Sequence, residues 1–191
     1  MKIVLLGDTK VGKTWLLHRL KHGVVPNDSS ATIGAAYSSY CMQLPSGAVQ
    51  MQIYDTAGQE KYRSLAPMYY RAADCAILVF DITEPSTFYS LRSWMMELSE
   101  RGPSKIQVYV VGTKADLESK RKVSQQTAST FAKDNHARGY METSALTGFG
   151  VLELFTEVAR SFLENSDMKL DEGLSTPIQH EKENKKEKSC C

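Results

Sequence analysis

The chain has 191 residues, of which 42% are hydrophobic, and its 23 lysines and arginines against 22 aspartates and glutamates give a formal net charge of +1. This length suffices for one domain with a sizeable core plus a tail. The near-neutral charge gives no indication of nucleic-acid binding, and no apolar stretch approaches the roughly 20 residues of a membrane-spanning helix. No signal peptide is expected, so the chain is predicted to stay in the cytosol. Cys41 and Cys75 are expected as buried reduced thiols in strands.

A strand, a glycine-bounded loop and a helix are expected at the start of the chain. The apolar residues 3–6 lead directly into the sequence GDTKVGKT, and a helix is expected over 13–21. This is the phosphate-binding pattern G-x-x-x-x-G-K-[ST] in the context that it requires. Its glycines let backbone N–H groups point at a phosphate, Lys13 supplies positive charge, and the Thr14 hydroxyl can ligate Mg²⁺. The predicted phosphate-binding residues of the loop are Gly7, Asp8, Thr9, Lys10, Val11, Gly12, Lys13 and Thr14.

Strand-like and helix-like segments alternate along the rest of the chain. The expected strands are 37–44 and 48–54, joined as a hairpin by Pro45-Ser46-Gly47, and then 75–81, 107–112 and 140–143. Helices are expected after Pro85, after a capping Ser124, and along 151–162. The alternation predicts an α/β fold with a mostly parallel sheet, helices on both faces, and ligands at the carboxyl ends of the strands. From Asn165 the composition turns polar, and 165–189 are expected to form a disordered tether.

Four residues outside the loop are candidates for the γ-phosphate and its metal ion. Asp55 follows the expected strand 48–54, the acidic position that holds Mg²⁺ in phosphate-loop proteins. Gly58 lets the backbone approach the γ-phosphate, and the amide of Gln59 can orient the attacking water. Thr32 lies in a polar loop, from which its hydroxyl can reach Mg²⁺ and its N–H the γ-phosphate. The predicted metal ligands are Thr14, Thr32 and Asp55, and the predicted catalytic residues are Lys13, Thr32 and Gln59.

A second group of candidates follows the later strands. Asp116, in the run Thr113-Lys114-Ala115-Asp116, can accept hydrogen bonds from both N1–H and N2–H₂ of guanine. Adenine has no such pair of donors, so this carboxylate selects GTP over ATP. In the run Ser144-Ala145-Leu146, the N–H of Ala145 can bond guanine O6. The predicted guanine-binding residues are Thr113, Lys114, Asp116, Ser144, Ala145 and Leu146.

With these motifs in order, the chain resembles a small Ras-like GTPase and, within that superfamily, a Rab. The resemblance covers about residues 2–164 and the last two residues, and the runs IGAAY at 33–37 and LAPMYY at 65–70 are most similar to the early-endosome branch of the Rabs. It implies a P-loop NTPase small G domain over 1–164, with a six-stranded, mostly parallel sheet, one antiparallel edge strand and five flanking helices. A hypervariable tail over 165–191 is implied to follow.

The resemblance also implies a molecular switch and its partners. GTP and Mg²⁺ order the loops around Thr32 and Gln59, and hydrolysis, slow without an activating protein, releases them. Exchange factors, GTPase-activating proteins, a GDP-dissociation inhibitor or prenylation escort, and effectors are the implied partners. Tyr37, Tyr54 and Tyr69 match the residues that face effectors. The implied location is the cytosol and the cytoplasmic face of endomembranes, at the early endosome.

The last two residues, Cys190 and Cys191, resemble the double-cysteine tail that receives two geranylgeranyl groups. No C-a-a-X box is present. Two chains make physical sense, because one lipid gives only marginal membrane binding and the tail is weakly basic.

The sequence departs from the family pattern at positions that hold the base. Thr113 stands where the family has the asparagine of N-K-x-D, and Val25 where it has an aromatic that stacks against guanine. Leu146, Tyr54 and Ala72 replace a lysine, a tryptophan and a glycine of the family. A lost hydrogen bond and a lost aromatic contact together predict nucleotide binding weaker by ~1–3 kcal/mol.

Two other functions compete with the switch. The first is a nucleotide-loose, fast-exchanging adaptor that recruits partners with little regulated hydrolysis, and Thr113 and Val25 motivate it. The second is an ATP-using P-loop kinase, which the guanine-reading Asp116 and the absence of a substrate lid disfavour. Slow spontaneous release of GDP would argue against the adaptor.

Overall fold

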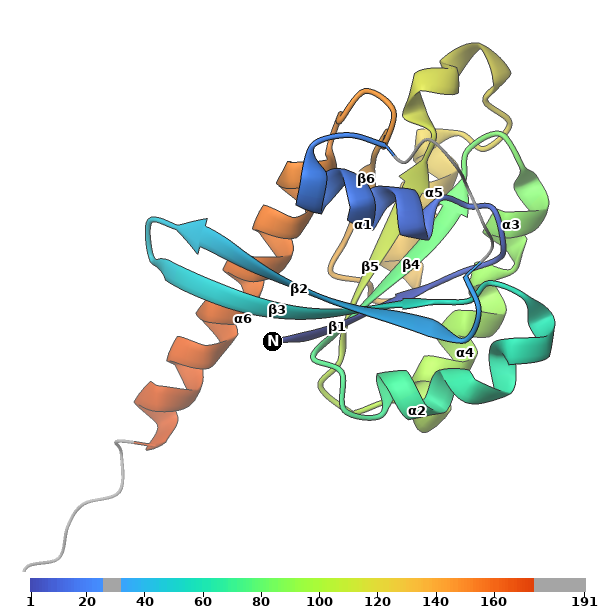
Figure 1. Ribbon diagram of the computed structural model, residues 1–191. Coiled ribbons are helices and arrows are strands. Elements are labelled where there is room, and N and C mark those ends of the chain that lie inside the picture. Colours follow the sequence, from blue (N-terminus) through green and yellow to red (C-terminus); the bar gives the residue numbers. More distant parts are fainter. Residues whose placement is uncertain (26–31, 174–191) are drawn as a thin grey trace, which may run out of the picture.

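The computed structural model describes residues 1–25 and 32–173, which form a six-stranded sheet flanked by helices (Figure 1). The strands are β1 (Lys2–Leu6), β2 (Ala35–Leu44), β3 (Gly47–Thr56), β4 (Cys75–Asp81), β5 (Gln107–Thr113) and β6 (Gly139–Glu142). The α-helices are α1 (Lys13–His22), α2 (Ala66–Tyr70), α3 (Pro85–Tyr89), α4 (Leu91–Arg101), α5 (Gln125–Asp134) and α6 (Val151–Gly173), and the 3₁₀ helices are η1 (Glu60–Leu65) and η2 (Ala115–Lys120).

The sheet is mixed, with the order β2-β3-β1-β4-β5-β6. Only the hairpin pair β2–β3 is antiparallel among the described strands, and the other neighbouring pairs run parallel. The predicted fold class, a small G domain with one antiparallel edge strand, is therefore confirmed. Because β1, β3, β4, β5 and β6 are parallel, their carboxyl ends meet at one edge of the sheet.

Two hydrophobic cores lie on opposite faces of the sheet. Successive side chains of β1 point to alternate faces, so Ile3 and Leu5 pack with α1 and α6, and Val4 and Leu6 pack with the helices α2 to α5. Every residue of β4 is buried, as expected for a central strand covered on both faces. Helices therefore cover both faces of the sheet, and the functional loops emerge at the edge formed by the carboxyl ends of its parallel strands.

Three details differ from the sequence-based expectations. The helix after Pro85 is divided into α3 and α4 at Ser90, whose side chain bonds the carbonyl of Ser86. Helix α6 continues to Gly173, past the expected start of the tether at Asn165, because no proline or glycine interrupts it before that point. Cys75 is buried as predicted, but Cys41, on the edge strand β2, is exposed.

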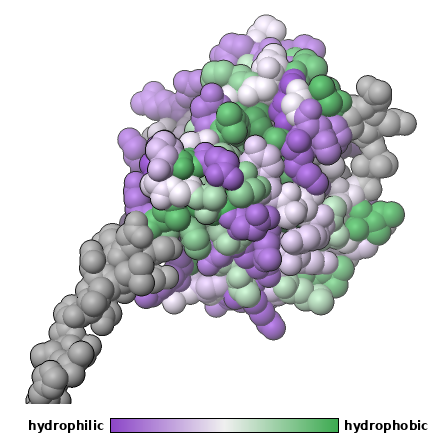
Figure 2. All heavy atoms as spheres, turned by 60° about the vertical axis from the view of Figure 1, so that its left-hand side comes forward, coloured by the Kyte–Doolittle hydropathy of each residue, from purple (hydrophilic) through white to green (hydrophobic). Residues whose placement is uncertain are grey.

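The predicted lipidation residues, Cys190 and Cys191, lie outside the described residues. None of the described helices is long and apolar enough to cross a lipid bilayer. Figure 2 shows hydrophilic side chains interspersed with separate hydrophobic patches over one face of the molecule. No continuous hydrophobic belt covers that face.

Candidate functional site

The loop between β1 and α1 folds around its own lysine. Gly7, Lys10 and Gly12 all have positive φ, which coils the backbone. A side chain on Gly7 would place its Cβ 2.2 Å from the carbonyl oxygen of Val79, so only glycine fits there. The Lys13 ammonium lies inside the coil and donates to the carbonyl oxygens of Gly7 and Asp8, each at 2.7 Å.

Lys13 is only 6% exposed, and this burial governs its charge. Burial lowers the pKa of Lys13 to about 8, although the nearby carboxylates of Asp55 and Asp8 oppose the shift. A polyphosphate placed against Lys13 would add negative charge and favour the ammonium form. The loop is therefore built to gain stability when an anion binds.

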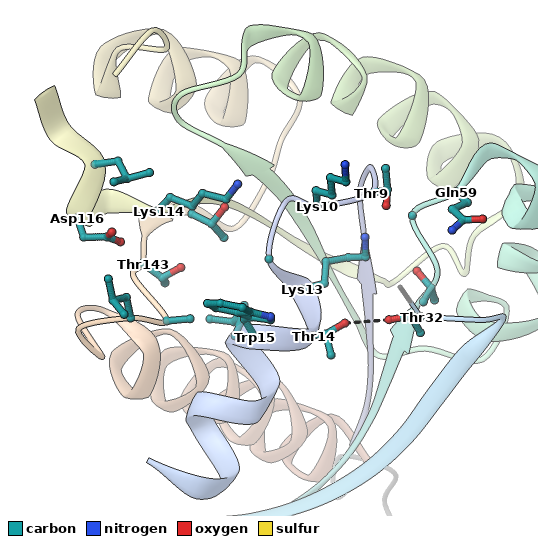
Figure 3. A pocket seen from close by; sticks show the side chains of 18 residues that line it. Thr9, Lys10, Lys13, Thr14, Trp15, Thr32, Gln59, Lys114, Asp116 and Thr143 are labelled. Carbon is teal, nitrogen blue, oxygen red and sulfur yellow. Dashed lines mark hydrogen bonds between the residues drawn. The ribbon is translucent and has the colours of Figure 1, made fainter. Parts of the chain in front are cut away.

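The three predicted metal ligands come together beside this lysine. The hydroxyl of Thr14 donates to Oδ2 of Asp55 at 2.6 Å and lies 2.9 Å from the hydroxyl of Thr32 (dashed line in Figure 3). Asp55 is 1% exposed, and its Oδ1 has no hydrogen-bond partner among the described residues. Burial raises the pKa of Asp55, against the hydrogen bond from Thr14 and the charge of Lys13.

This set of oxygens fits Mg²⁺. A buried carboxylate oxygen without a partner is costly, and Mg²⁺ prefers hard oxygen ligands, binding through one or two protein groups together with waters and phosphates. In residues 1–25 and 32–173, no three His, Cys, Asp or Glu side chains gather into an alternative metal site. The hydroxyls of Thr14 and Thr32 and the carboxylate of Asp55 would hold the ion beside the phosphate loop.

The loop after β3 packs directly on the phosphate loop. A Cβ on Gly58 would lie 2.3 Å from backbone atoms of Asp8 and Thr9, so this close approach requires glycine. The N–H of Ala57 donates to the carbonyl of Gly34 at 2.7 Å, which joins this loop to the segment that follows Thr32. Gln59 lines the same cavity as Lys13 and Thr32, on the side away from Asp116 (Figure 3).

Thr113 connects β5 to the phosphate loop. Its hydroxyl lies 2.6 Å from the carbonyl oxygen of Val11 and 2.8 Å from that of Phe80, and its proton can serve either acceptor. Thr113 is only 4% exposed, so this hydrogen bonding is shielded from water. Thr113 therefore ties the end of β5 to the phosphate loop through its hydroxyl, although it has no amide.

The other residues predicted to bind guanine are held in place by polar contacts. Ser144 is fully buried and donates to Oδ1 of Asp116 at 2.5 Å, which orients the carboxylate. The ammonium of Lys114 pairs with Oδ2 of Asp81 at 2.5 Å. Burial alone would raise the pKa of Asp81, but hydrogen bonds from Lys114 and Thr83 hold it below its ordinary value.

Arg19 is a site residue that sequence reasoning missed. From α1 its Nε donates to the carbonyl of Ala145 at 2.5 Å, and its other nitrogens bond the carbonyls of Leu146 and Gly23. The guanidinium thus holds the loop that carries Ala145 and Leu146 against the end of α1. Ala145 and Leu146 lie 126 and 127 positions away from Arg19, so no local pattern signals these two contacts.

One cavity of about 850 Å³ joins the two ends. Its lining includes Lys13, Thr14 and Thr32 at one end and Thr113, Asp116 and Ala145 at the other. The volume lies within the range typical of small-molecule and cofactor sites, which is ~300–1,000 Å³. Predicted phosphate, metal and base residues therefore all contribute to the lining of a space of the right size for one nucleotide, whereas Asp55 and Ser144 lie behind that lining.

The predicted effector-facing tyrosines form a cluster on β2, β3 and α2. The ring centroids of Tyr37 and Tyr54 are 5.4 Å apart, and those of Tyr54 and Tyr69 are 5.9 Å apart. Tyr37 is 57% exposed, and the ammonium of Lys2 lies 4.8 Å from the Tyr54 ring centroid. The structure thus brings the three side chains together.

The family comparison agrees with this geometry. The family model described as Ras family matches residues 2–164, which include every element from β1 to the packed part of α6. Ras-family proteins are in general GTP hydrolases that bind GTP or GDP with Mg²⁺. They generally interact with exchange factors, GTPase-activating proteins and effectors. The chain belongs to the Ras family of small GTPases.

Proposed function

We propose that this chain is a Rab-like switch that binds GTP and GDP with Mg²⁺, hydrolyses GTP slowly, and regulates vesicle traffic at endosomal membranes. The observation that carries the proposal is the continuous cavity between the buried ammonium of Lys13 and the oriented carboxylate of Asp116. A site with both groups at its ends suits a ligand that is anionic at one end and carries a guanine at the other.

The chain's own groups supply most of what phosphoryl transfer needs. When bound, Mg²⁺ neutralises charge on the β- and γ-phosphates. Lys13 and the backbone N–H groups of the loop stabilise the charge that develops on the phosphate oxygens. The amide of Gln59 orients the attacking water. No arginine is among the described residues that line the cavity, so an activating protein is expected to supply one.

Ordering of the loops around Thr32 and Gln59 would provide the readout of the switch. Thr32 and Gly58 would contact the metal ion and the γ-phosphate, and the hydrogen bond from Ala57 to Gly34 links their segments. The tyrosine cluster lies on the strands and helix next to these loops, so an effector that contacts it would also sense their state.

Membrane attachment completes the proposal. Cys190 and Cys191 would each receive a geranylgeranyl group, and a GDP-dissociation inhibitor or prenylation escort would cover the lipids in the cytosol. The similarity of 33–37 and 65–70 to early-endosome Rabs supports the compartment. Replacing both cysteines by serine should move a fluorescently tagged full chain from endosomal membranes to the cytosol. An unchanged membrane fraction would contradict this part of the proposal.

The fast-exchanging adaptor remains the second candidate. Thr113 has no amide for the base and Val25 has no ring, both of which favour rapid release of nucleotide. The hydroxyl tie from Thr113 to Val11 and the contacts of Arg19 oppose it, because they hold the guanine end together. Guanine nucleotide that stays bound through purification of the full chain would decide for the switch.

The base assignment can be tested by exchanging one group. In Asp116→Asn the carboxylate that accepts from guanine N1–H and N2–H₂ becomes an amide that can donate to the additional carbonyl of xanthine. We expect GDP affinity to fall by about 100-fold or more and affinity for xanthosine diphosphate to rise. An equal loss of affinity for GDP and for xanthosine diphosphate in a folded variant would contradict the role of Asp116.

Hydrolysis can be tested separately with Gln59→Leu. Single-turnover release of phosphate from bound GTP should slow markedly, while GDP affinity should stay near that of the unmodified chain, because Gln59 positions only the water. Unchanged hydrolysis would remove Gln59 from the proposed mechanism.

A further inference from the structure

The cavity contains an aromatic side chain that its sequence motifs do not explain. Trp15 directly follows Thr14 in the first turn of α1, and it is the one aromatic residue among the described residues that line the cavity. We propose that the indole of Trp15 packs against the nucleoside of the bound nucleotide and takes over the role of the aromatic residue that Val25 replaces. The inference rests on the proposed nucleotide binding and names a further residue that contributes to it.

Trp15 lies between the phosphate end and the guanine end of the cavity. Figure 3 shows its ring between Thr14 and Thr143, along one side of the cavity, with Lys13 and Asp116 toward opposite sides. A nucleotide with its phosphates at Lys13 and its base at Asp116 would occupy the cavity that Trp15 also lines. Val25, by contrast, is not among the described residues that line the cavity.

The environment of Trp15 leaves its ring available to a ligand. The side chain is partly exposed rather than buried, although it belongs to a helix whose Leu16, Leu17 and Leu20 fill the core. A large apolar ring that faces an open cavity gains free energy when a flat partner covers it. Purine bases and ribose offer such a surface, and aromatic contact with a base depends little on hydrogen-bond geometry.

The second tryptophan of the chain provides the contrast. Trp94 in α4 is 4% exposed, and the guanidinium of Arg63 lies 4.2 Å from its ring centroid. It packs in the core on the opposite face of the sheet from α1, so its ring has no open side toward the nucleotide cavity. Trp94 is therefore a structural residue, and Trp94→Phe leaves Trp15 as the single fluorescent tryptophan.

Fluorescence of the full chain tests the contact directly. In Trp94→Phe, titration with GDP and Mg²⁺ should change tryptophan emission in a saturable way, because the base or ribose covers the indole. Inorganic pyrophosphate, which has no nucleoside, should not reproduce the full change. Saturable GDP binding by a second method without any change in Trp15 emission would overturn the proposal.

Affinity measurements show whether the contact contributes to binding. Trp15→Ala should weaken GDP binding by about 5- to 150-fold, the range that loss of a base–aromatic contact produces, and Trp15→Phe should restore most of it. The affinity for pyrophosphate, measured by competition, should be the same in the unmodified chain, Trp15→Ala and Trp15→Phe. A general defect of the phosphate loop would instead lower it in the variants. Thermal unfolding of each variant checks that the fold is intact.

The outcomes separate this inference from the proposed function. If the unmodified chain binds no GDP, the proposed function fails and takes the inference with it. If the unmodified chain binds GDP selectively and Trp15→Ala binds it within about twofold, the function stands and the role of Trp15 is overturned. Should Trp15→Ala not fold, the emission of Trp94→Phe on titration with GDP decides the question.

Discussion

The phosphate end and the guanine end of the cavity are held in different ways. At the phosphate end, Lys13 bonds carbonyl groups five and six positions away, within its own loop. At the guanine end, Thr113 reaches Val11 across 102 positions and Arg19 reaches Ala145 across 126. A lysine held within its own loop requires that motif to be intact, whereas a loop held by long-range contacts tolerates a substitution when another group makes the same contact.

The largest effect is expected at the phosphate end, from Lys13→Ala. It removes a buried cation that bonds its own loop and would bond the phosphates, at a cost of at least ~3 kcal/mol or about 100-fold in GDP affinity. Titration with labelled GDP in the presence of Mg²⁺ measures the loss. Lys105→Ala, at an exposed position away from the cavity, is the matched control. Unchanged affinity in Lys13→Ala would show that the loop does not bind the nucleotide.

A smaller effect is expected from Thr113→Ala at the guanine end. The substitution leaves the buried carbonyls of Val11 and Phe80 without the hydroxyl, which costs ~1–3 kcal/mol. Release of GDP should accelerate by about 5- to 150-fold, as followed by displacement of labelled nucleotide. Thr113→Ser keeps the hydroxyl and should release GDP at close to the original rate. If serine behaves like alanine, the hydroxyl is not the connecting group.

The smallest effect is expected from Arg19→Ala. Its hydrogen bonds to Ala145, Leu146 and Gly23 are partly exposed to water, so we expect only about 1 kcal/mol, or about fivefold faster GDP release. The control is Arg160→Ala, because Arg160 lies on α6 and, among the residues that the structure describes, makes an exposed ion pair with Glu157. Equal release rates in the two variants would mean that the Ala145 loop holds its position without Arg19.

The same contrast explains how much the sequence predicted. The phosphate loop and the buried strand β4 were predicted because each is set by neighbouring residues, through a motif or an apolar run. The contacts of Thr113 and Arg19 were not predicted, because their partners are chosen by the folded sheet and not by spacing. The break at Ser90 and the continuation of α6 to Gly173 were missed because local propensity places element ends poorly.

We expect the guanine end of the cavity to select guanine despite its substitutions. Competition of GDP and ADP for the full chain, with Mg²⁺ present and labelled GDP as the probe, tests it most directly. We expect saturable GDP binding and ADP affinity at least about 100-fold lower, because ADP has no donor pair for Asp116. Equal competition by ADP, or no saturable binding of GDP, would contradict the account.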